Sequence, residues 1–80
     1  MVTVRFFGLA RDAFGQREII VRASTVGEIL GAAAETADAK RLLRGALIFV
    51  NGSPVTGSRR FRRRLRDGDE LAVLTPAGGG

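Results

Sequence analysis

The sequence of 80 residues predicts an α+β fold, a mixed sheet of four to five strands with one main helix packed on one face. Several short segments alternate apolar with polar residues or are rich in β-branched and aromatic residues, which is typical of strands. One segment, residues 26–36, repeats its apolar residues at helical spacing. A chain of this length forms one domain, placed at residues 1–76 and followed by a flexible Gly-rich tail at residues 77–80.

Two strands are expected first, at residues 2–7 and 17–22, paired antiparallel. In the first strand the alternate residues 2, 4 and 6 share the core face. Phe7 points the other way. It either folds under a loop as a satellite of the core or stays exposed as a contact for a partner. Gly8 follows it and suits a bend or the close approach of another backbone.

The connection between these strands, residues 8–15, has room for one or two helical turns that end at Gly15, with Leu9 and Phe14 capping the core. The main helix is then expected from Val26 to Thr36. It begins with a capping box, in which the Thr25 hydroxyl accepts the amide of Glu28 and the Glu28 side chain reaches back to the Thr25 amide. Residues 38–45 add a second short turn.

A continuous apolar run, residues 46–50, predicts a central strand that is buried on both faces. The tight turn Asn51-Gly52 leads to a short return strand near Val55, which Pro54 confines to an edge of the sheet. The last strand is expected at residues 70–75, where Pro76 ends the ladder because it has no amide donor. This order of elements is that of a ubiquitin-like β-grasp.

The side-chain inventory excludes several kinds of chemistry. Without cysteine there is no disulfide, thiolate nucleophile or sulfur-ligated zinc, and without histidine the serines lack the usual base for nucleophilic catalysis. We therefore expect a protein that is not catalytic alone, holds no metal and no tightly bound cofactor, and enters chemistry as a substrate or carrier. No apolar run approaches the roughly 20 residues of a membrane span, and a strand stands where a signal peptide would, which predicts a cytoplasmic protein.

Three glycines, residues 78–80, follow the last strand. Because glycine has no Cβ, such a segment passes through channels too narrow for a side chain. From the residues alone, it is either a working arm that presents the terminal carboxylate or simply a frayed end.

Four segments resemble the MoaD/ThiS family of sulfur carriers, most closely the small subunits of molybdopterin synthase. They are Val4–Asp12, Thr25–Leu30, Val50–Gly52 and Leu65–Leu74, and the terminal Gly79-Gly80 follows them. The resemblance implies that an E1-like enzyme uses ATP to adenylate the Gly80 carboxylate, which a persulfide source converts to a thiocarboxylate. The sulfur then passes to a partner, such as the large subunit of molybdopterin synthase. Gly79 has to be glycine so that it fits a narrow channel.

Members of this family dock through an apolar patch beside the tail. By position, the resemblance assigns partner contacts to Phe7, Arg11, Val55, Leu74, Pro76 and Gly78. The family's usual ending carries Pro-Pro, where this chain has a more flexible approach, residues 75–78. From the residues alone, Leu74 also fits the core, and Arg11 fits a solvated helix end.

Six arginines stand among the eight positions 59–66, in a chain whose net charge is +5. Around Phe61 they fit a nucleic-acid-binding module, in which they neutralise phosphates while the ring stacks on a base. The single aromatic residue and the absence of any such signature favour a solvated loop or a docking surface for an acidic partner. Sulfur carriers for thiamine, cysteine or other pathways, and a ubiquitin-like modifier of lysines, also stay open, because all begin with the acyl-adenylate.

Overall fold

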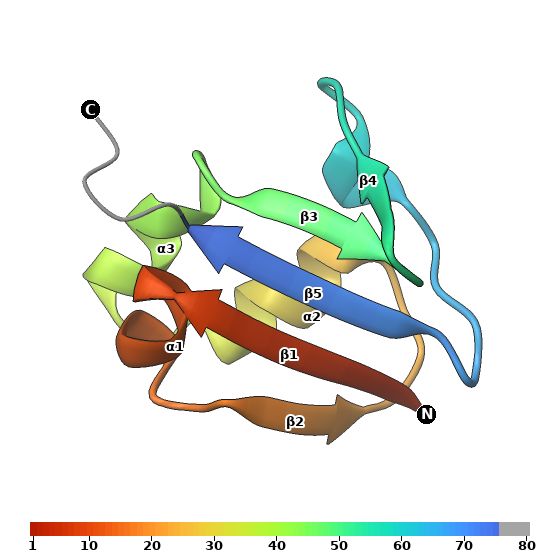
Figure 1. Cartoon of the computed structure of the whole chain (residues 1–80), viewed down its shortest axis with the longest axis horizontal. Coiled ribbons are helices and arrows are strands. Elements are labelled where there is room, and N and C mark those ends of the chain that lie inside the picture. The colour runs from red at the N-terminus through yellow and green to blue at the C-terminus, as the bar shows by residue number, and fades with distance from the viewer. Residues whose placement is uncertain (76–80) are drawn as a thin grey trace.

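The computed structural model describes residues 1–75 and shows a five-stranded mixed sheet with α2 and α3 on one side of it (Figure 1). The elements are β1 (Val2–Gly8), α1 (Leu9–Phe14), β2 (Glu18–Val21), α2 (Val26–Ala33), α3 (Ala37–Leu43), β3 (Leu47–Val50), β4 (Ser53–Val55), the 3₁₀ helix η1 (Arg60–Arg62) and β5 (Glu70–Thr75). The strand order is β2-β1-β5-β3-β4, and the β1–β5 pair is parallel while the other pairs are antiparallel. The predicted ubiquitin-like β-grasp is confirmed.

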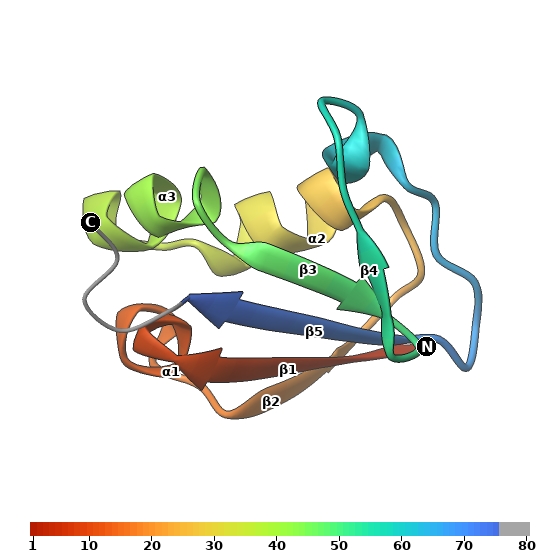
Figure 2. The same cartoon turned by 45° about the horizontal axis from the view of Figure 1, so that its top comes forward.

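The core lies between the sheet and α2, which crosses behind β5 and β3 in Figure 1 and rises above them in Figure 2. Its largest fully buried side chains are Val2, Val4, Phe6, Val26, Leu30, Leu71 and Val73. Phe14 stacks on Phe6 with 4.6 Å between the ring centroids, so it caps the core as predicted. The same prediction is wrong for Leu9, which is 42% exposed.

The main helix predicted at residues 26–36 is shorter than expected, and a second helix follows it. The Glu28 amide donates to the Thr25 hydroxyl at 3.1 Å and so begins α2 as expected. The helix ends at Ala33, because Thr36 caps a new helix by accepting the Ala39 amide at 3.0 Å. The short turn expected at residues 38–45 is accordingly the seven-residue helix α3.

The expectation that β3 is central and buried on both faces is wrong. β5 occupies the centre, and β3 lies between it and the edge strand β4. Only alternate residues of β3 face the core, because the helices cover one side of the sheet. Ile48 and Val50 are buried, whereas Leu47 is 47% exposed. The turn at Asn51-Gly52 has φ angles of 52° and 82°, both left-handed, and confirms the predicted tight turn.

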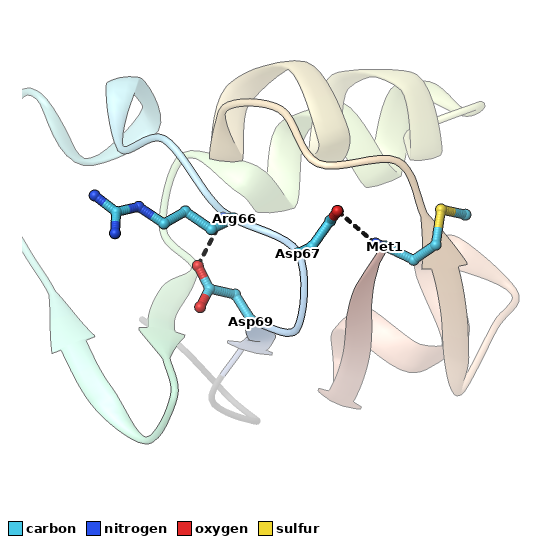
Figure 3. A network of polar contacts seen from close by, with 4 residues as sticks. All are labelled: Met1, Arg66, Asp67 and Asp69. Carbon is cyan, nitrogen blue, oxygen red and sulfur yellow. Dashed lines mark hydrogen bonds and ion pairs between the residues drawn. The ribbon is translucent and has the colours of Figure 1, made fainter.

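The turn at residues 66–69 joins the start of β5 to both neighbouring strands. The Met1 ammonium pairs with the Asp67 carboxylate, and the Arg66 amide donates to Asp69 Oδ2 at 2.8 Å (Figure 3). The other Asp69 oxygen accepts from Asn51 Nδ2 at 3.0 Å, and the Glu70 amide donates to Asn51 Oδ1 at 2.9 Å. Two turns distant in the sequence therefore fix each other and the register of β5.

Candidate functional site

Three apolar side chains form a row across the uncovered face of the sheet, toward the end of β5. In the strand register, Phe7 of β1 pairs with Leu74 of β5, which pairs with Leu47 of β3. Phe7 is 46% exposed, Leu47 is 47% exposed and Leu74 is half-buried. We call these three residues the outer apolar row. Phe7 is thus not folded under a loop, and Leu74 lies on the face opposite the core.

The apolar surface continues two residues toward the start of β5. There Ala72 pairs with Phe49, which in turn pairs with Pro54 of the edge strand. Phe49 is half-buried and lies on the same face as Leu47, because residues two apart in a strand point the same way. A contiguous exposed apolar surface of this kind is typical of a protein interaction site.

Gly8 allows the end of β5 to lie where it does. Its φ is +60°, and a Cβ at this position would stand 2.5 Å from the Thr75 carbonyl oxygen. The close approach of another backbone, predicted from the sequence, is therefore confirmed. Thr75 is 4% exposed, and its hydroxyl has no hydrogen-bond partner among the described residues.

The other predicted contact residues are placed differently. Arg11 is exposed on α1, which follows Gly8 directly, so it lies at the same end of the sheet as the outer apolar row. Val55 does not join the row, because its register partner is the buried Ile48 and its side chain packs against the core.

The remaining predicted site residues, Pro76, Gly78, Gly79 and Gly80, lie outside the described residues.

Leu47 and Phe49 escaped the sequence analysis. Their apolar neighbours made the whole run 46–50 look buried on both faces. The helical segments predicted besides residues 26–36 are short, and this is the signal that would have found Leu47 and Phe49. A sheet of this width with one main helix leaves one face of β3 without a cover, so its outward residues are exposed.

Within residues 1–75, the site offers contacts for a partner. Among residues 1–75, no cluster of three histidine, cysteine, aspartate or glutamate side chains is arranged as metal ligands would be. Lowered pKa values occur at Glu28, through hydrogen bonds from Thr25 and Ser24, and at Asp69, through hydrogen bonds from the Arg66 amide and Asn51. Both carboxylates support local structure. No described helix is long and apolar enough to span a bilayer.

Comparison with solved structures finds the same fold in several proteins that form complexes. The BexX/CysO complex of Amycolatopsis orientalis matches with a TM-score of 0.75 and 28% identity over 100% of both chains. The complex of subunits 1 and 2 of the molybdopterin-converting factor from Helicobacter pylori matches with a TM-score of 0.68 and 26% identity, over 99% of this chain and 97% of that one.

The fold extends to the small archaeal modifier protein 1 of Methanosarcina acetivorans, with a TM-score of 0.76 and 22% identity over 99% of this chain and 95% of that one. No curated protein sequence matches the chain significantly. The sequence model of the ThiS family matches residues 4–80. The chain therefore belongs to the ThiS family, among the ubiquitin-like sulfur carriers and modifiers.

Proposed function

We propose that this protein is a sulfur carrier. The Gly80 carboxylate is adenylated by a separate E1-like enzyme with ATP, is converted to a thiocarboxylate and serves as the sulfur donor. The observation that carries the proposal is the family match, which extends through Gly80. The outer apolar row supports it, because a partner that docks there meets the strand that leads to residues 76–80.

The chemistry suits a chain without cysteine or histidine. A carboxylate is a poor acyl donor, so adenylation first gives its carbonyl carbon a good leaving group, AMP, with release of pyrophosphate. The terminal sulfur of a persulfide then displaces AMP, and cleavage of the S–S bond by a thiol leaves the thiocarboxylate. The carrier supplies a reachable carboxyl group and a docking surface, while ATP binds to the activating enzyme.

For the acceptor, we propose the large subunit of molybdopterin synthase, with this chain as the small subunit. The likeness to the Helicobacter pylori complex, which covers 99% of this chain, supports this assignment. In the proposed complex of this chain with a large subunit, the outer apolar row packs against the large subunit while Gly80 delivers sulfur. The likeness to the BexX/CysO complex supports a different acceptor, so a test has to include both kinds of partner.

The first experiment is the intact mass of the protein after incubation with ATP, a persulfide donor and the E1-like enzyme from its own source. We expect a gain that corresponds to one oxygen replaced by sulfur, and none in a variant that lacks Gly80. The variant should unfold at the same denaturant concentration as the parent, because the core is built from residues 2–73. No gain with an enzyme that charges another carrier would contradict the proposal, and attachment to protein lysines would favour a modifier.

The acceptor is tested with the thiocarboxylate form made in this way. It is mixed separately with a molybdopterin synthase large subunit and its pterin substrate, and with a partner of the BexX type. Sulfur loss from the carrier only in the first mixture is the expected result. Loss only in the second would remove the molybdopterin assignment while leaving the carrier function intact.

A further inference from the structure

The proposed sulfur transfer leaves the arginine segment, residues 59–66, without a role. Its backbone is held firmly against the start of α2. The Val26 amide donates to the Arg63 carbonyl at 2.9 Å, and the Leu65 amide donates to the Ser24 carbonyl at 2.9 Å. Thr25 and Arg64 form an isolated antiparallel bridge, and the Leu65 side chain is buried in the core. The segment is thus a fixed scaffold, not a loose loop.

Two members of the segment are engaged within the protein. The Arg60 guanidinium donates to the carbonyls of Gly57 at 3.1 Å and Arg44 at 3.0 Å, and it lies 4.5 Å from the centroid of the Phe61 ring. Phe61 packs against the core and against Gly27, where a Cβ would stand 3.0 Å from the Phe61 carbonyl oxygen. One face of the ring is therefore covered by Arg60, which leaves it poorly placed to stack on a nucleic-acid base.

The other five arginines are exposed and only partly balanced. They are Arg59, Arg62, Arg63, Arg64 and Arg66. Two carboxylates interact electrostatically with these arginines: Glu28 with Arg64, and Asp69 with Arg63 and Arg66. Among the salt bridges of residues 1–75, none involves an arginine of the segment. An excess of positive charge is therefore available to a partner.

The two ends of the segment differ in their distance from the outer apolar row. The Arg60 guanidinium reaches the Arg44 carbonyl, which lies just before β3 and Leu47, whereas Arg66 lies near the start of β5, away from the row. In Figures 1 and 2, η1 lies beside β4, and the chain that follows it runs down to the start of β5. A strand of six residues is about 20 Å long, which exceeds the screening length of roughly 8 Å at physiological salt. Charge near Arg66 is thus largely screened from the row, whereas Arg60 lies close to it.

We propose that the arginine segment is a second docking surface, which binds an acidic protein segment through Arg–carboxylate pairs. Arginine forks bind carboxylates through two parallel hydrogen bonds, and a fixed backbone lowers the entropy lost on binding. Nucleic acid also binds arginine, but the engagement of Phe61 removes the stacking platform. The inference depends on this segment alone and stands whether or not Gly80 carries sulfur.

The test is an NMR titration of the ¹⁵N-labelled full chain at physiological salt. The probes are a short glutamate-rich peptide and a single-stranded oligouridine of equal charge. We expect the peptide to shift the amide signals of residues 59–66 and to bind more tightly than the oligouridine. The triple variant R62E/R63E/R64E should lose about tenfold or more in peptide affinity, because three charge-assisted contacts become repulsive.

Two further variants decide how the charge acts. R17E/R22E/K40E makes the same change in net charge at exposed sites elsewhere and should cost less than about threefold, because screening weakens distant charges. R62K/R63K/R64K keeps the charge and removes the forks, and it should still weaken binding several-fold. Equal losses in the two glutamate variants, full affinity in the lysine variant, or tighter binding of oligouridine would each overturn the proposal.

Discussion

The two ends of β5 are built in opposite ways. At its start, the Asn51 side chain donates to Asp69 and accepts from the Glu70 amide. The Arg66 amide also donates to Asp69, and Asp67 pairs with the terminal ammonium (Figure 3). At its end, Gly8 admits the Thr75 backbone, and the neighbouring outward side chains are apolar and half-buried or exposed. The difference separates two tasks. Polar side chains fix the register at one end, while the other end keeps its surface available for a partner.

The buried face of the same strand shows no such difference. Leu71, near the start, and Val73, near the end, are both fully buried, so the core holds the whole length of β5. Exposed apolar residues on the opposite face are therefore not required to keep the strand in place. The outer apolar row can therefore be changed without unfolding the domain.

The largest effect is expected from Gly8→Ala at the end of β5. A Cβ there meets the Thr75 carbonyl oxygen at 2.5 Å, and the φ of +60° is unfavourable for any side chain. We expect a loss of about 2–4 kcal/mol in the free energy of unfolding, measured with urea. Gly15→Ala is the matched control, since Gly15 has a φ of +70° but no neighbour within 4 Å. It should cost only about 1–2 kcal/mol.

Equal losses in these two variants would contradict the role of close backbone approach at Gly8. The position of Thr75 at the end of β5 would then depend on the backbone conformation of Gly8 and not on the close approach of the two backbones.

A smaller effect on stability, with a clear effect on binding, is expected from Leu47→Glu. Calorimetric titration with the activating enzyme or the acceptor should show a loss of about tenfold or more, because a charge enters the centre of an apolar contact. The free energy of unfolding should change by less than about 1 kcal/mol, since Leu47 is 47% exposed.

Ile20→Glu is the matched control for that variant. Ile20 is 62% exposed on β2 and pairs with Thr3, toward the other end of the sheet. We expect its affinity to stay within about twofold of the parent, as for residues outside an interface. A similar loss in both variants would show that the outer apolar row is not the contact surface.

The elements that the sequence predicted best are those with a strict local signal. Alternation placed β1, and the run from Glu70 to Thr75 matched β5 in full. The end of α2 was placed at Thr36 and not at Ala33, because apolar spacing continues past Ala33 and the cap at Thr36 has no glutamate to complete a capping box. Where the first helix ends and the next one begins depends on how the chain packs, and apolar spacing alone does not contain that information.

The contact surface was predictable only in part, because a strand shows which residues share a face but not which face is covered. The resemblance to sulfur carriers pointed to Phe7 and Leu74, and the structure places them side by side. Position alone also pointed to Val55, which the register turns toward the core, and it overlooked Leu47. A shift of one residue reverses the face, so this part required the strand pairing.

The last and smallest effect concerns pH and the polar start of β5. The pKa of Asp69 is lowered, chiefly by the hydrogen bond from the Arg66 amide and then by Asn51. A lowered folded-state pKa means that the unfolded chain binds more protons, so the stabilisation is complete above the ordinary value of 3.8 and is lost as pH falls below it. Urea midpoints measured across this range should therefore fall less steeply with acid in Asp69→Asn than in the parent.

Asn51→Gly tests the smaller contribution to this pKa, because glycine keeps the left-handed φ of 52° while the side chain that donates to Asp69 and accepts from the Glu70 amide is removed. It should flatten the acid dependence less than Asp69→Asn does, since the Arg66 amide still donates to the carboxylate. Added salt should leave most of the dependence in place, because the charges of Arg63 and Arg66 are lesser causes than the hydrogen bonds. If salt removed it, the start of β5 would be held by the field of the arginine segment, and the two ends would differ in charge and not in hydrogen bonding.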